Sequence, residues 1–139
     1  MKKSIFVHLL LTTIISLQSL AQCKSEELSN SCVPKLAASG FNFLKTYKID
    51  GEKDLTKVEY SYVFTKGTQY MIALCGEDEG TIMVTLYDSE RNKVATNKVK
   101  GSLLTGLVYP CNATGIYYIQ YTFEGSSQRC GGSALGFKK

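Results

Sequence analysis

From Phe41 onward, apolar and polar residues alternate along the chain with a period of two, the pattern of β-strands that bury one face. Clusters of glycine, asparagine, aspartate and serine interrupt this alternation. The pattern predicts strands over residues 41–50, 58–65, 70–74, 82–87, 94–99, 103–109, 115–123 and 134–137. The connections between them are too short for crossover helices, so neighbouring strands are expected to pair antiparallel. We therefore predict an all-β fold, an antiparallel β-sandwich of about seven or eight strands.

Two glycine- and serine-containing segments and the N-terminal region depart from this pattern. Residues 125–128 and 131–133 are expected to form a loop on either side of Cys130. Between Ser25 and Gly40 the signals favour helix: Ser25 is suited to cap a helix, Pro34 to begin one, and Gly40 to follow its end. A short N-terminal helical segment, about one or two turns long, is therefore expected before the strands.

The first 21 residues have the order of a secretory signal peptide. Lys2 and Lys3 precede an apolar stretch, and the small residues Ser19 and Ala21 form a cleavage site. The apolar stretch is shorter than the roughly 20 residues of a membrane span, although a retained N-terminal anchor is the alternative. We predict a signal peptide over 1–21 and a single exported domain over 22–139. No other segment is expected to cross a membrane.

Charge and histidine content exclude several functions. The chain has 16 Lys+Arg against 12 Asp+Glu, a formal net charge of +4, and its basic residues are scattered among carboxylates. A nucleic-acid partner usually needs a concentrated basic face, so none is expected. The only histidine, His8, belongs to the predicted signal peptide. The exported domain therefore lacks a Ser-His-Asp or Cys-His site and a histidine-ligated metal, and we expect neither catalysis nor a cofactor.

The cysteines of an exported domain are expected to form disulfides. Cys75 and Cys111 each follow a predicted strand, so a Cys75–Cys111 bridge at one rim of a sheet is the first hypothesis. The second, Cys32–Cys130, would join the two terminal segments. Cys23 then pairs locally with Cys32 or stays unpaired.

Cys23 also has a second interpretation. The sequence from Leu20 to Cys23 resembles the lipobox of bacterial lipoproteins, which implies a lipid anchor on Cys23, although Gln22 departs from the small residue usual at that position. Cleavage after Ala21 without lipidation fits the small-residue rule better. Both alternatives place the domain outside the cytoplasm, in a periplasmic, extracellular or outer-membrane-associated location.

Three segments between Gly67 and Ile119 resemble the bacterial pre-peptidase C-terminal domain. They are Gly-Thr-Gln-Tyr over 67–70, Ile-Met-Val-Thr-Leu-Tyr-Asp-Ser over 82–89, and Thr-Gly-Ile-Tyr-Tyr-Ile over 114–119. The resemblance implies a jelly-roll-like sandwich and a role in secretion, folding or substrate attachment. This chain departs from that family because it has no peptidase beside it and carries additional cysteines.

Two clusters of side chains are candidate sites. Glu77, Asp78 and Glu79 form an acidic turn, a weak calcium candidate because it lacks the alternating spacing of a calcium loop. Tyr87, Tyr117 and Tyr121 are candidates for an exposed aromatic platform, with packing inside the sandwich as the alternative. Glu59 and Glu124 would form a glycosidase-like pair only if their strands faced one cleft.

These observations favour a non-catalytic binding or accessory module of the cell envelope or secreted fraction, in a Gram-negative-type bacterium. Its expected ligand is a glycan or an envelope protein. The alternatives are a small carboxylate-based hydrolase and a structural or assembly protein that associates through a cysteine or an edge strand.

Overall fold

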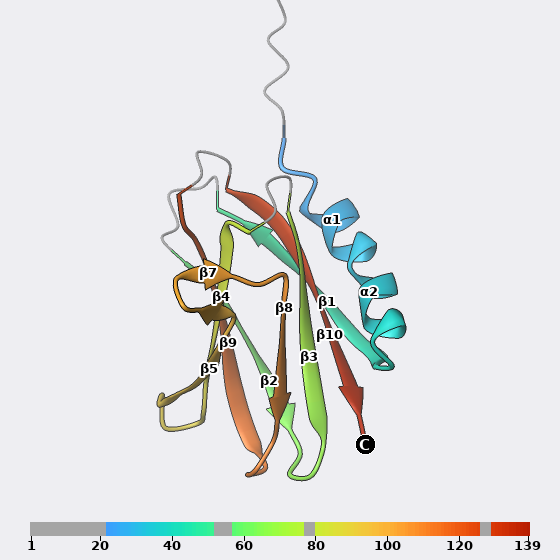
Figure 1. Cartoon of the computed structure of the whole chain (residues 1–139), viewed down its shortest axis with the longest axis vertical. Helices are drawn as coiled ribbons and strands as arrows, with labels where there is room; N and C mark the ends of the chain where they lie inside the picture. Colours follow the sequence, from blue (N-terminus) through green and yellow to red (C-terminus); the bar gives the residue numbers. More distant parts are fainter. Residues whose placement is uncertain (1–21, 52–56, 77–79, 126–128) are drawn as a thin grey trace, which may run out of the picture.

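The computed structural model describes residues 22–51, 57–76, 80–125 and 129–139. Within these ranges the chain forms two short helices followed by strands (Figure 1). The helices are α1 (Ser25–Ser31) and α2 (Val33–Ala38). The strands are β1 (Asn42–Asp50), β2 (Val58–Phe64), β3 (Gln69–Gly76), β4 (Ile82–Tyr87), β5 (Lys93–Thr96), β6 (Lys98–Val99), β7 (Ser102–Leu103), β8 (Gly106–Pro110), β9 (Gly115–Phe123) and β10 (Cys130–Lys138).

Eight of these strands form two four-stranded sheets that pack face to face. Sheet A has the order β1-β10-β3-β8 and sheet B the order β2-β9-β4-β5, while β6 and β7 pair with each other. Every neighbouring pair is antiparallel. The partners β1·β10, β2·β9, β3·β8 and β4·β5 are those of one long hairpin wrapped into two layers, which is jelly-roll topology. The predicted antiparallel sandwich is confirmed.

Alternating side chains from the inner faces of the two sheets make the core. The buried residues at its centre are Tyr47, Ile49, Phe64, Tyr70, Ile72, Leu74, Ile82, Val84, Leu86, Tyr117, Ile119, Tyr121 and Leu135. Phe64 of sheet B stacks on Tyr70 of sheet A with ring centroids 3.9 Å apart, and on Tyr117 of the neighbouring strand at 4.9 Å. This aromatic stack joins the two layers at one end of the sandwich.

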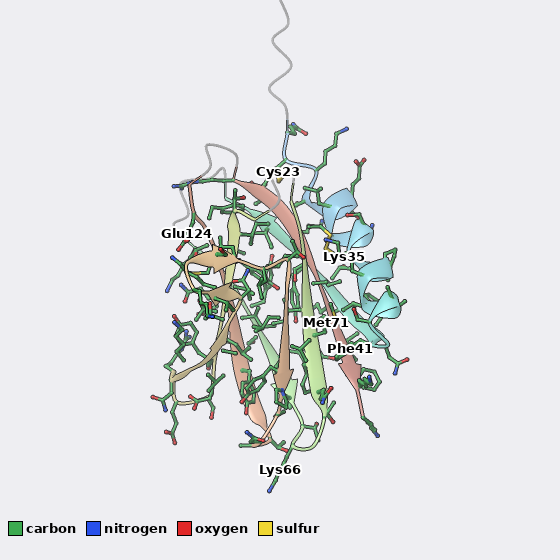
Figure 2. The ribbon with its side chains drawn as sticks, viewed as in Figure 1. Cys23, Lys35, Phe41, Lys66, Met71 and Glu124 are labelled. Atoms are coloured by element: carbon green, nitrogen blue, oxygen red, sulfur yellow. A yellow bond between two sulfur atoms is a disulfide. The ribbon has the colours of Figure 1, made fainter. Side chains whose placement is uncertain are left out.

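The two helices form a third layer on the outer face of sheet A (Figure 1). Glycines in β10 let them lie close to the strand: a side chain at Gly132 would overlap the backbone of Ser29 in α1, and one at Gly136 would lie 3.1 Å from Cδ1 and Cδ2 of Leu36 in α2. Lys35, labelled in Figure 2, adds a hydrogen bond from its Nζ to the carbonyl oxygen of Leu74, at 3.0 Å.

Two sequence predictions are corrected in this region. Residues 131–133 are part of strand β10 and not of a loop, because their small side chains allow the helices to approach. The helical segment is also longer than expected, with helices of seven and six residues. Pro34 does lie in the first turn of α2, and Gly40 follows its end with φ of 78°.

Two disulfides attach the helical layer to sheet A. Cys23, just before α1, pairs with Cys130 at the start of β10, and Cys32, between the helices, pairs with Cys75 of β3. The bridges span 107 and 43 residues of sequence. Loop-closure entropy makes them worth about 5 and about 4 kcal/mol, respectively.

Neither predicted disulfide is present, and strand direction explains why. Because β8 runs antiparallel to β3, Cys111 after the end of β8 lies beside Thr68 at the start of β3, at the rim opposite Cys75. Cys111 is a free, buried cysteine. The predicted Cys32–Cys130 pair is wrong because each of these cysteines bonds to another sulfur. Cys23 is neither unpaired nor lipidated here, since a sulfur bonded to Cys130 is not available for a thioether.

The close approach of the helices predicts that Gly132→Ala destabilises the protein. The added methyl group meets the backbone of α1, so we expect a loss of about 2 to 3 kcal/mol in the free energy of unfolding. Gly106→Ala is the matched control, because its methyl group would have contacts no closer than 3.5 Å. Urea denaturation measures both variants, and equal stabilities would contradict this account of the helical layer.

Candidate functional site

The outer face of sheet B is the main sheet surface that the helices leave uncovered. Because side chains alternate across a strand, the residues adjacent to core positions point outward here. We call the surface formed by the outward-pointing residues of β2, β9 and β4 the open face. Its members are Glu59, Ser61, Val63, Met83, Thr85, Tyr87, Ile116, Tyr118, Gln120 and Thr122.

Tyr118 lies at the centre of the open face. It is opposite Ser61 on β2 and opposite Tyr87 on β4. The guanidinium group of Arg91 lies 3.7 Å from the centroid of the Tyr118 ring, at cation–π distance. The same guanidinium donates a hydrogen bond from Nη1 to Oε1 of Glu59, at 2.7 Å. Three side chains from different elements therefore form one cluster on the open face.

The turn between β4 and β5 places Arg91. Oδ1 of Asp88 accepts hydrogen bonds from the backbone N–H groups of Glu90 (3.0 Å) and Asn92 (2.9 Å). This bonding is an Asx turn, and it lets Arg91 adopt a left-handed backbone conformation with φ of 65°. The hydrogen bond that Arg91 donates to Glu59 raises the pKa of Arg91, with the charge of Glu59 adding to the effect. The cation is thus fixed above the sheet before any ligand arrives.

The structure separates the three tyrosines of the predicted aromatic platform. Tyr87 lies on the open face, half-buried. Tyr117 and Tyr121 are wrong, since they are 3% and 0% exposed in the core. Tyr118, which sequence reasoning missed, takes their place. Its signal was present in the sequence, because Gln120 and Thr122 are polar and share the same side of the strand.

The buried tyrosines differ in how their hydroxyl groups are satisfied. The Tyr121 hydroxyl donates to Oγ of Ser133 at 2.8 Å, and the Tyr117 hydroxyl donates to the carbonyl oxygen of Ala113 at 2.6 Å. Burial raises the pKa of both phenols. The Tyr47 hydroxyl is buried without a hydrogen-bond partner among the described residues. Burial, with smaller contributions from Tyr62 and Tyr60, raises its pKa to about 12.

Glu59 and Glu124 do not face each other as a pair of acids. Glu59 contacts Arg91, whereas Oε2 of Glu124 lies 3.1 Å from Nζ of Lys98. Glu59 is opposite Gln120, four residues before Glu124, which separates the two backbones by about 13 Å along the strand. The calcium candidates Glu77, Asp78 and Glu79 lie outside the described residues. Elsewhere in the described ranges no group of three or more His, Cys, Asp or Glu side chains could hold a metal ion.

Comparison with known proteins gives no assignment: no family model and no curated protein sequence matches the chain. Among the described helices, none is long and apolar enough to cross a membrane.

The contrast between the buried hydroxyls predicts opposite effects of two similar substitutions. Tyr47→Phe removes an unpartnered polar group, so we expect the free energy of unfolding to be unchanged or to rise by up to about 1 kcal/mol. Tyr121→Phe breaks the bond to Ser133 and should lower it by about 1 kcal/mol. Chemical denaturation at neutral pH measures both. A loss of stability in Tyr47→Phe equal to that in Tyr121→Phe would contradict the hydrogen-bond assignment.

The raised pKa of Tyr47 predicts a change of stability in alkali. The unfolded phenol ionises near pH 10, whereas the folded one ionises at about 12. Between these values the unfolded state has lost its proton and the folded state retains it, so the stability that is present below pH 10 declines as the pH rises. The loss of stability from pH 9.5 to 11.5 should therefore be smaller in Tyr47→Phe than in the unmodified protein. Identical pH profiles would show that Tyr47 does not contribute.

Proposed function

We propose that this protein is a non-catalytic binding module whose ligand is another protein, recognised by the open face of sheet B. The observation that carries the proposal is the cluster of Glu59, Arg91 and Tyr118. Tyrosine and arginine are enriched among the residues that dominate binding energy at protein interfaces. Here both are held in place before binding, which lowers the entropy lost on association.

The shape and chemistry of the face support a protein ligand over a glycan. Small-molecule sites usually enclose most of their ligand, whereas this cluster stands on the open surface of a sheet, with the Arg91 side chain 53% exposed. Sugars stack on exposed aromatic faces, but the Arg91 guanidinium already lies over one face of the Tyr118 ring. The apolar side chains beside the cluster, Val63 (57% exposed) and Ile116 (47%), extend the contact area in the way a protein interface requires.

The alternatives have less support. A carboxylate hydrolase needs two acids across one cleft, and Glu59 and Glu124 are instead paired with separate cations. Assembly through an intermolecular disulfide needs an accessible thiol, and the free Cys111 is only 3% exposed. A glycan ligand remains the second candidate, through the half-buried Tyr87.

Two disulfides are typical of a protein that matures in an oxidising compartment. We propose that residues 1–21 direct export and that the domain acts in the periplasm, at the outer membrane or outside the cell. The resemblance to the pre-peptidase C-terminal domain supports an accessory role of this kind.

The proposal predicts that single changes in the cluster abolish binding without unfolding the domain. Tyr118→Ala and Arg91→Gln should each weaken capture of the partner by at least about tenfold. Lys93→Gln, in the adjacent strand β5, is the matched control for charge and should have little effect. The measurement is quantitative mass spectrometry of envelope proteins retained on the immobilised domain, with a glycan array in parallel. Glycan binding without protein binding would reject the proposal, as would equal retention by all variants.

A further inference from the structure

Strand β2 is the edge of sheet B next to the open face, and its main chain is available for pairing. Val84 of β4 donates its N–H to Oδ1 of Asn97 (2.8 Å), and its carbonyl oxygen accepts from the Asn97 N–H (3.3 Å). The polar main-chain groups of Val84 therefore point away from β9. Those of residues 83, 85 and 87 point toward β9, because the direction alternates along a strand.

The register of β4 with β9, and of β9 with β2, shows which main-chain groups of β2 point toward β9 and which point away. Residues 83, 85 and 87 are opposite 122, 120 and 118, so 117, 119 and 121 direct their polar groups toward β2. Their partners there are Tyr62, Tyr60 and Val58. Glu59, Ser61 and Val63 are thus left with their N–H and C=O groups along the free edge. No hydrogen bond to another element satisfies these groups among the described residues.

The other three edge strands carry features that hinder pairing with another chain. Strand β1 has a register shift at Phe43/Lys45 and two lysines, β8 has five residues and ends in Pro110, and β5 has four residues and begins with Lys93. Lysine, proline, bulges and short length are the usual protections of sheet edges. The seven residues of β2 include no lysine, proline or glycine, and they pair with β9 without a register shift.

Charge at the two ends of β2 indicates the kind of partner. Lys57 and Lys66 are exposed just outside the strand, and neither forms an ion pair with a described residue. A second copy is disfavoured, because antiparallel pairing of β2 with itself about Ser61 would set Lys57 of one copy opposite Thr65 of the other, next to Lys66 of that copy. Carboxylates near both ends of an incoming strand would instead complement these lysines.

We propose that the partner docks as an extended segment of another protein, with acidic residues near its two ends, and adds a fifth strand to sheet B along β2. The inference rests on the proposed function and names how the partner binds. Main-chain hydrogen bonds to Glu59, Ser61 and Val63 supply the affinity. A hollow of about 440 Å³ formed by Ser61, Tyr62, Val63 and Ile116 accepts an apolar side chain of the added strand.

The test removes one edge N–H and leaves the β2–β9 ladder intact. Proline is tolerated on an edge strand where the N–H faces solvent, so Ser61→Pro should fold, and Ser61→Thr is the matched control that keeps the N–H. The probe is a phage library of random nonapeptides selected on the immobilised domain. We expect recovered peptides with alternating β-branched residues and aspartate or glutamate near both ends. Ser61→Pro should weaken their binding by at least about tenfold, and Ser61→Thr should not.

Several outcomes would overturn the inference. These are recovery of no peptides, equal binding by Ser61→Pro and Ser61→Thr, or binding that Lys57→Gln and Lys66→Gln leave unchanged. A dimer of the unmodified domain that Ser61→Pro dissociates would identify a second copy as the occupant. If Ser61→Pro does not fold, amide hydrogen exchange decides, because a bound peptide must protect Glu59, Ser61 and Val63. One outcome separates the two proposals: Arg91→Gln abolishes the retention of envelope proteins, but Ser61→Pro does not. It would support the proposed function and reject only strand addition along β2.

Discussion

The contact between helix α1 and the bare backbone of Gly132 determines which surface of this protein is free to bind. Because no side chain separates the helix from β10, the helical layer lies directly on sheet A, and the disulfides at Cys32 and Cys130 attach it there. Residues 131–133 of β10, whose sequence predicts a loop, are therefore buried between the helical layer and sheet B. The helices cover the outer face of sheet A over β1, β10 and β3, whereas β8 at its edge leaves Val108 exposed. Sheet B, which packs on sheet A through one face only, presents the other.

The alternation of side chains then sorts the tyrosines into two roles. In β9, Tyr117 points inward and stacks on Phe64, whereas Tyr118, one residue later, points outward beneath Arg91. The inward ring fills the core and the outward ring holds a cation in place. A single residue's displacement in register would exchange the two, so the packing of Phe64 and Tyr70 between the sheets also fixes the cluster on the open face.

Sequence reasoning recovered what depends on neighbours along the chain and missed what depends on neighbours across the fold. The alternation with a period of two located the strands, because the core-facing positions of each strand are apolar in that strand's own sequence. The disulfides were wrong because the ends of two antiparallel strands lie at opposite rims, and the pairing of β3 with β8 is not encoded near Cys75 or Cys111. The predicted aromatic platform was wrong for a different reason, because Tyr117 and Tyr121 were assigned to the outward side of β9. The polar residues Gln120 and Thr122 would have indicated that Tyr118 faces outward.

The edge of β2 and the open face are parts of one mechanical unit. A strand can serve as a template for another only if it keeps its own position when the new strand pairs with it. Glu59 belongs to β2, and its carboxylate accepts a hydrogen bond from Arg91, whose guanidinium extends from the turn between β4 and β5 over Tyr118 of β9. This contact therefore joins β2, at the free edge of sheet B, to the turn between β4 and β5 on the other side of β9. Arg91, above the open face, thereby helps to hold β2 in position. A partner that binds both the open face and the edge of β2 therefore meets a surface that is ordered before binding.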